Sequence, residues 1–89
     1  LLYWAVYEKN YAFTQRLIRH GVNVNKKDKL SRTVLHIACY FGFYDIAELL
    51  LQHGAVVDTS CFERASNGWD SHYQSEIIDL LRKYAPQLN

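Results

Sequence analysis

Apolar residues in the middle of the chain recur at the spacing of two short helix faces. Leu35, Ala38 and Cys39 follow one another at i, i+3 and i+4, which indicates one side of a helix. A second, wider apolar face follows in Ile46 and residues 49–51. The two faces are separated by a few turn residues only, so the pattern predicts a pair of helices packed on each other.

Cap and turn residues bracket these two helices. Thr33 can accept a hydrogen bond from the first turn of a helix, and Gly42 suits the left-handed position at a helix end. Asp45 places a negative charge at the start of the second helix, which Gly54 then closes. We expect residues 55–62 to follow as an extended turn or hairpin.

The same pattern returns at a fixed offset along the chain. His20-Gly21-Val22 recurs as His53-Gly54-Ala55. The same offset also pairs further apolar positions: Leu2 with Leu35, Ala5 with Ala38, Leu17 with Leu50 and Val24 with Val57. A fixed period of about 20–50 residues is the signature of stacked repeats, in which neighbouring units share one core.

The second of these units resembles the ankyrin repeat. Asp28 and residues 33–38 match the opening D-x-x-G-x-T-P-L-H-x-A, and residues 42–55 match G…I-V-x-L-L-L-x-x-G-A. Ser31 replaces the turn glycine and Val34 replaces the proline, so a positive φ at Ser31 would be strained. The resemblance implies an all-α solenoid of antiparallel helix pairs joined by projecting β-hairpins or turns.

We expect a single repeat domain over residues 1–89. It divides into a partial repeat (1–25), a full repeat (26–58) and a degenerate C-terminal capping repeat (59–89). The first helix of the third unit is expected near residues 65–73, although Ser-Asn-Gly there is a turn signal. The fold of residues 62–75 therefore stays open between a short, distorted helix and a loop.

The last helix is predicted over residues 76–85 and ends before Pro86. The chain begins abruptly on apolar residues and holds fewer than three complete units, whereas about three are usually needed for stability. We therefore expect it to be part of a longer array.

Charge is unevenly distributed along the chain. The net charge is only +1, which argues against a general attraction to nucleic acid or membrane. Residues 1–32 nevertheless carry seven basic and two acidic residues, and residues 33–89 carry three and seven. Four of the basic residues crowd into residues 26–32, where they either accept an acidic partner or only keep an exposed turn in solution. One such patch neutralises few phosphates, which disfavours nucleic acid as the partner.

Catalytic motifs are missing from the sequence. It contains no phosphate-binding glycine loop and no nucleophile elbow, so we expect no enzyme activity and no cofactor. His36 and Cys39 lie on one face of the same predicted helix and could share a metal, but the sequence offers no second ligand pair. The resemblance implies instead that His36 is structural, with its ring hydrogen-bonded to neighbouring turns.

Localisation is predicted from the cysteines and from the absence of a leader. Cys39 and Cys61 are too few for a disulfide scaffold, and no apolar run approaches the length of a membrane span. We expect an intracellular protein of the cytoplasm, the nucleus or both, with no membrane insertion.

The resemblance implies a non-catalytic module that binds a protein or peptide segment on its concave face, with an acidic segment favoured by the basic patch. The candidate contact residues occupy positions outside the family pattern: Tyr7, Glu8, Lys29, Leu30, Arg32, Tyr40, Phe41 and Phe62. The alternative is a structural part that caps a longer solenoid in a larger multidomain protein, such as a ubiquitin-ligase substrate receptor.

Overall fold

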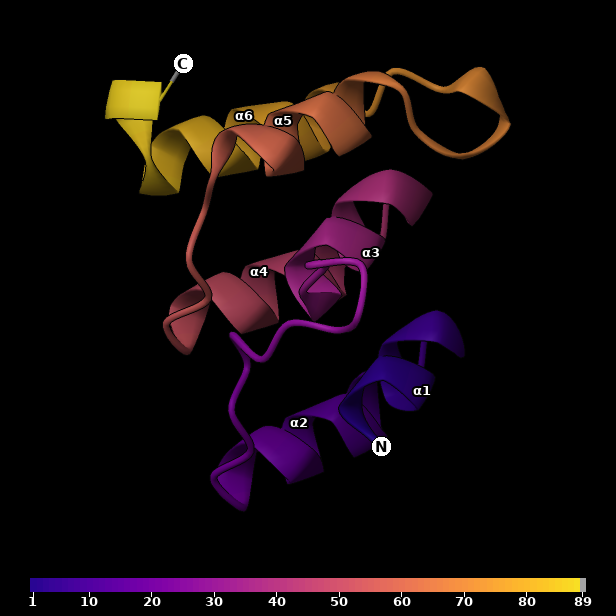
Figure 1. Cartoon of the computed structure of the whole chain (residues 1–89), viewed down its shortest axis with the longest axis vertical. Helices are drawn as coiled ribbons and strands as arrows, with labels where there is room; N and C mark the ends of the chain where they lie inside the picture. The colour runs from indigo at the N-terminus through magenta and orange to yellow at the C-terminus, as the bar shows by residue number, and fades with distance from the viewer. Residues whose placement is uncertain (89) are drawn as a thin grey trace.

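The computed structural model describes residues 1–88, and Figure 1 shows them as three stacked pairs of helices. In chain order the elements are α1 (Leu2–Tyr7), α2 (Tyr11–Arg19), α3 (Val34–Phe41), α4 (Tyr44–Gln52), α5 (Thr59–Ser66), η1 (Trp69–Ser71), α6 (Ser75–Tyr84) and η2 (Pro86–Leu88). This is the all-α solenoid that the repeat pattern predicts. Residues 1–88 contain no strand, so the projecting segment between α2 and α3 is a turn rather than a β-hairpin.

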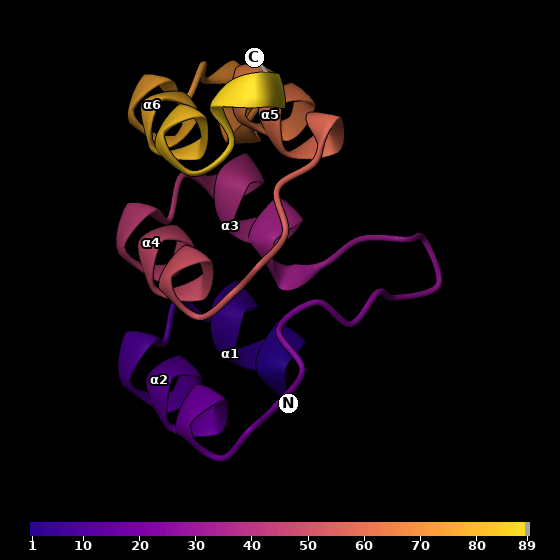
Figure 2. The ribbon, with the colours of Figure 1, turned by 90° about the vertical axis from the view of Figure 1, so that its left-hand side faces the viewer.

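The helices form two layers. Figure 2 shows α1, α3 and α5 on one side of the stack and α2, α4 and α6 on the other. We call the first three the inner helices and the other three the outer helices, or outer layer. Residues 26–32 project past the inner helices. The central helix α3 packs against α1, α4 and α5. The surface formed by the inner helices and the projecting turn is the concave face of the repeat family.

Local sequence explains why α2 and α3 form where they do. The Asn10 side-chain oxygen accepts from the backbone N–H of Phe13 at 3.1 Å and caps α2. At α3, the backbone N–H of Thr33 donates to Nδ1 of His36 at 2.9 Å, and Gly42 ends the helix with a φ of 74°. The predicted start and end of this helix are confirmed.

The core is shared between neighbouring units. The side chains that fill it come from all of α1 to α6, and the largest with almost no exposure are Leu35, Ile46, Leu50, Ile77, Leu81, Val6 and Val34. Polar links reinforce the stacking: the Asn25 amide donates to the carbonyl of Gly54 at 3.0 Å and accepts from the N–H of Val56 at 2.8 Å. One asparagine therefore joins the ends of the first and second helix pairs.

The third unit differs from the expectation. Its inner helix α5 covers Thr59–Ser66, so the prediction of a helix near residues 65–73 is wrong. The predicted extended segment over residues 55–62 is limited to positions 55–58, which lie outside any helix, and is wrong for positions 59–62. The side chain of Asp58 accepts from the N–H of Cys61 at 3.1 Å and starts the helix there. The unit lacks a projecting turn, because the connection from α4 to α5, at positions 53–58, is much shorter than that from α2 to α3, at positions 20–33.

Residues 67–74 form a loop that leads from α5 into α6. It contains the short helix η1, so the turn signal in this stretch is confirmed, and α6 ends at Tyr84, just before Pro86. Within residues 1–88, no helix is both long and apolar enough to cross a membrane.

Candidate partner-binding surface

The projecting turn between α2 and α3, residues 26–32, is here named the basic turn. Its shape depends on Asp28, whose Oδ1 accepts from the backbone N–H groups of Leu30 at 2.8 Å and Arg32 at 2.9 Å. Oδ2 of Asp28 accepts from Nε of Arg32 at 2.9 Å. Ser31 has a φ of 63°, the strained conformation expected where the family has glycine.

These hydrogen bonds also set the charge states at the base of the turn. The backbone N–H of Arg32 is the main cause of the lowered pKa of Asp28, and its guanidinium lowers that pKa further. The Asp28 carboxylate in turn raises the pKa of Arg32. Both groups are therefore charged at neutral pH and partly neutralise each other, which leaves the three lysines to define the charge of the turn.

The basic turn is attached to the first unit by Tyr3 of α1. The hydroxyl oxygen lies 2.6 Å from the backbone carbonyls of both Lys26 and Arg32, so its single proton is held between the two sides of the turn. At the tip, Leu30 remains 71% exposed. Of the predicted contact residues here, Lys29 and Leu30 are exposed to solvent, whereas Arg32 is half-buried.

A row of touching aromatic rings runs along the ends of the inner helices, and we name Tyr7, Tyr40, Phe41, Phe43 and Trp69 the aromatic strip. Phe41 is at its centre: its ring centroid lies 5.9 Å from that of Tyr7, 5.0 Å from Tyr40 and 5.7 Å from Trp69. These separations are those of attractive aromatic pairs. The strip thus connects the first unit to the third.

Sequence reasoning found only part of this strip. It named Tyr7, Tyr40 and Phe41, which the structure brings together, but it missed Phe43 and Trp69. The shortened third unit hid Trp69, because at the repeat offset it has no counterpart among the contact positions. The sequence signal that could have found it is the glycine–tryptophan pair at a turn.

Two predicted contact residues differ in their surroundings. Glu8 is exposed at the end of α1, beside Tyr7 of the strip. Phe62 was expected on a projecting hairpin, and this placement is wrong: it lies on α5, where its ring is partly buried against the core. The reason is that Asp58 starts α5 before any hairpin can form.

A buried polar cluster joins the second unit to the third. Nε2 of His36 lies 3.0 Å from Oδ1 of Asp58, while Nδ1 accepts from the Thr33 N–H. Cys61 makes the largest contribution to the raised pKa of His36, and Asp58 adds to it. The predicted structural role of His36 is thus supported, with a carboxylate in place of one backbone partner.

The pKa values of the two cysteines next to this cluster are shifted in opposite directions. A hydrogen bond to Cys61 is the main cause of the raised pKa of Cys39, and the same bond is the main cause of the lowered pKa of Cys61. Both side chains are free thiols and are fully buried.

Donor atoms of His36, Asp58 and Cys61 lie within 4.8 Å of one another, so the sequence missed two residues that could join His36 around a metal. The hydrogen bonds favour another use. Nδ1 accepts a hydrogen bond from the Thr33 N–H, so Nε2 carries the ring proton and donates it to Asp58. A metal at Nε2 would require a proton on Nδ1, facing the Thr33 N–H. The arrangement therefore suits a structural link between α3 and α5.

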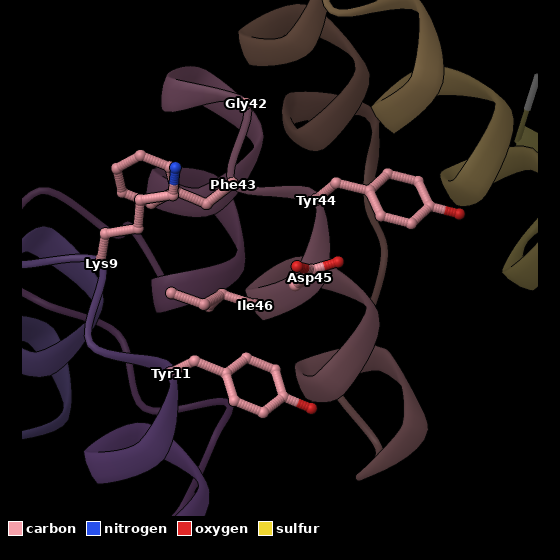
Figure 3. A pocket seen from close by; sticks show the side chains of 7 residues that line it. All are labelled: Lys9, Tyr11, Gly42, Phe43, Tyr44, Asp45 and Ile46. Carbon is pink, nitrogen blue, oxygen red and sulfur yellow. The ribbon is translucent and has the colours of Figure 1, made fainter.

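A hollow of about 240 Å³ lies between the α1–α2 turn and the α3–α4 turn (Figure 3). The Lys9 side chain reaches over Phe43, with Nζ 5.5 Å from the ring centroid, a cation–π geometry. Tyr11, Asp45 and Ile46 line the rest. Lys9 occupies the position of Gly42 in the second unit and, like it, has a positive φ, 54°. Its cation lies over Phe43 of the aromatic strip.

Comparison with known proteins agrees with the repeat pattern. A family model described as "Ankyrin repeats (many copies)" matches residues 2–51. Protein phosphatase 1 regulatory subunit 27 of Homo sapiens is 32% identical over 78 residues, which cover 88% of this chain and 46% of that protein. A putative ankyrin repeat protein of Acanthamoeba polyphaga mimivirus is 41% identical over 54 residues, which cover 61% of this chain and 7% of that protein.

BCL-6 corepressor-like protein 1 of Mus musculus is 48% identical over 44 residues, 49% of this chain and 2% of that protein. The chain therefore spans less than half the length of each of these relatives. No solved structure gives a significant match to it.

Proposed function

This chain belongs to the ankyrin-repeat family, and we propose that it is a non-catalytic module that binds a segment of a partner protein on its concave face. The aromatic strip carries the proposal: its rings touch from the first unit to the third, yet Tyr7 is 47% and Trp69 57% exposed. Exposed aromatic groups of this kind are typical of contact sites, because they bury a large area when a partner covers them.

The charge of the basic turn supports an acidic partner segment. Lys26, Lys27 and Lys29 have no ion pair within residues 1–88. The turn is held by Tyr3 against α1, the helix that ends at Tyr7 of the aromatic strip. A carboxylate-rich segment on the turn could therefore extend onto the strip. Nucleic acid fits less well, since the positive charge is confined to this one turn.

The relatives support partner binding. Ankyrin repeats are generally protein-interaction modules, and one relative is named as a regulatory subunit of protein phosphatase 1. We further infer an intracellular location, in the cytoplasm or the nucleus. The support is that Cys39 and Cys61 are neighbouring free thiols, as expected in a reducing compartment.

The test selects peptides from a random peptide display library on the whole chain and measures their affinity by fluorescence polarisation. Tyr7→Ala should lower the affinity of the selected peptides about tenfold or more, because truncating a central aromatic contact commonly reduces binding by that much. The matched control is Tyr84→Ala on α6, a tyrosine of similar exposure (39%) on the outer layer.

Charge is tested separately with Lys29→Glu and with increasing salt, both of which should weaken binding if the basic turn contributes. Peptides that bind Tyr7→Ala and Lys29→Glu like the unchanged chain, but lose affinity for Tyr84→Ala, would place the binding surface on the outer layer and overturn the proposal.

A second function is favoured by the end of the stack at α1 and α2. Leu1 is 82% and Trp4 53% exposed, and the Trp4 ring contacts Phe13 with centroids 5.9 Å apart above an open hollow. Such a face suits a preceding repeat, as in the alternative of a capping part in a larger protein. In that case adding one designed N-terminal repeat should raise the midpoint of thermal unfolding by many degrees, while peptide selection should enrich nothing.

A further inference from the structure

The loop after α5 is held in one shape against the end of α3. Gly68 approaches so closely that a Cβ there would lie 2.8 Å from the backbone oxygen of Tyr40. The Gly68 N–H donates to the carbonyl of His72 at 2.9 Å, and the Gln74 N–H donates to that of Ala65 at 2.8 Å. The loop is therefore closed on itself and docked on the aromatic strip.

Two residues of this loop adopt left-handed conformations without being glycine. Asp70 has a φ of 58° and Ser71 a φ of 61°. Consecutive left-handed residues are costly for side chains with a Cβ, and strain of this kind concentrates at functional positions. Here the strained residues follow Trp69, and Trp69 and Asp70 line one hollow.

That hollow has the chemistry of a cation site. Tyr40, Trp69 and Asp70 line it, together with small or polar residues, and it measures about 500 Å³. The two rings are inclined by 74° with centroids 6.5 Å apart, so they form adjoining walls. Ring faces and a carboxylate attract positive charge and repel negative charge.

Residues 1–88 supply no cation to this hollow. The Asp70 carboxylate has no hydrogen-bond or ion-pair partner among these residues, and no basic residue of this range lines the hollow. Arg64 lines the adjoining hollow, which shares Tyr40 with this one and also contains Glu63. His72 faces the backbone, with Nδ1 3.2 Å from the carbonyl of Trp69. At the other end of the strip, by contrast, Lys9 already lies over Phe43.

We propose that Tyr40, Trp69 and Asp70 form a subsite for a basic side chain, arginine or lysine, of the bound partner segment. The subsite deepens the function proposed above and rests on it. Its consequence is an orientation: the acidic part of the segment meets the basic turn, while a cationic side chain of the same segment enters the loop end of the strip.

The test uses small probes, so that it does not depend on an intact partner. The whole chain is labelled with ¹⁵N and titrated with N-acetyl-arginine amide, N-acetyl-lysine amide and, as the neutral isostere of arginine, N-acetyl-citrulline amide. The chain has two tryptophans, so the indole N–H signal of Trp4 serves as an internal control for that of Trp69. Trp69→Phe assigns the two signals.

Both cationic probes should shift the Trp69 signal saturably, with a dissociation constant on the order of millimolar for so small a ligand, and should leave Trp4 unmoved. Asp70→Asn should weaken the arginine probe about three- to tenfold, since it removes the charge. Asparagine tolerates the left-handed conformation, so this variant keeps the loop. Equal shifts with citrulline, or an unchanged affinity in Asp70→Asn, would overturn the subsite.

A second variant separates this proposal from the function on which it rests. Tyr7→Ala should weaken binding of the selected peptides about tenfold or more but leave the arginine shift at Trp69 unchanged. If arginine fails to bind while Tyr7→Ala still weakens peptide binding, the subsite is wrong and the module function stands. If arginine binds Trp69 but no peptide is ever selected, the module function is wrong and the cation site stands.

Discussion

The second and third helix pairs stack in the same way but differ in their turns, helix caps and connections. The second pair has a long projecting turn before it, an internal cap between Thr33 and His36, and a glycine between its helices. The third pair has no projecting turn, starts its inner helix on Asp58, and joins its helices through the loop at residues 67–74. A hydrogen bond between His36 of the second pair and Asp58 at the start of the third links the two.

This difference shows which parts of a repeat are needed for stacking and which are free to change. Both pairs keep fully buried side chains on both of their helices, for example Leu35 and Leu50 in the second pair and Cys61 and Leu81 in the third. The turn precedes the inner helix of its pair whereas the loop follows it, and each bears exposed residues that could meet a partner. Packing is therefore common to the two units, whereas contact chemistry is particular to each.

The largest effect is expected in the shared core. Leu50→Ala should lower the free energy of unfolding by about 3–4 kcal/mol and Leu81→Ala by about 2–3 kcal/mol, within the usual range for buried leucines. Leu50 should cost more because α4 is packed between α2 and α6, while α6 has a neighbouring helix pair on one side only. Urea unfolding measures both, with the exposed Val56→Ala as control. A larger loss at Leu81 would make the third pair, not the second, the centre of stability.

The next effect concerns the glycines of the two units. Gly68→Ala places a methyl group 2.8 Å from the Tyr40 carbonyl, so it should destabilise by about 2 kcal/mol. Gly54→Ala meets no atom within 4 Å but has a φ of 90°, so its cost should be nearer ~1 kcal/mol. Thermal unfolding of the two variants compares them. Equal losses would mean that the loop is not docked on α3 as described.

Acid should lower the stability of both units, because it protonates aspartates that are hydrogen-bonded in the folded chain. The backbone N–H of Arg32 is the main cause of the lowered pKa of Asp28. Burial is the largest single influence on the pKa of Asp58 and would raise it, but the hydrogen bond and charge of His36 together with the hydrogen bonds of Cys61 outweigh burial and lower that pKa. A carboxylate with a lowered folded-state pKa contributes stability above its unfolded value of 3.8, and this is lost as the pH falls through the folded value.

Urea unfolding between pH 6 and pH 2 should therefore show falling stability below about pH 4. Asp28→Asn and Asp58→Asn should each remove part of that fall, because each removes a carboxylate whose pKa is lowered in the folded chain. An acid response unchanged in both variants would mean that these hydrogen bonds do not persist in solution.

The smallest expected effect is a gain in stability. Ser31→Gly relieves the left-handed strain at the tip of the basic turn, where glycine is the family residue, and should raise stability by up to about 1 kcal/mol. Because the side chain of Ser31 is exposed, binding of acidic peptides should stay the same. A lower unfolding midpoint would show that the serine contributes more than its strain costs.

Sequence reasoning succeeded where the second unit repeats its local signals. The Thr33 start and the Gly42 end follow from cap and turn chemistry within a few residues, and both are found. The left-handed conformation of Ser31 agrees with the resemblance, because the family has glycine at this position. It failed for α5, because the repeat offset aligns Asp58 with Asn25 and so hides its role as a helix cap. Phe62 was misplaced with it.

The sequence by itself determined the family, the order of helix pairs and the three aromatic residues that begin the strip. Only the tertiary structure decided three contacts. Trp69 completes the strip, Asp58 accepts a hydrogen bond from His36, and Asp70 lines the same hollow as Tyr40 and Trp69. The physical reason is the distance along the chain over which each kind of signal acts. Caps and periodicity act between residues a few positions apart, whereas these contacts join α3 to a unit whose spacing had slipped, so no repeat offset could align them.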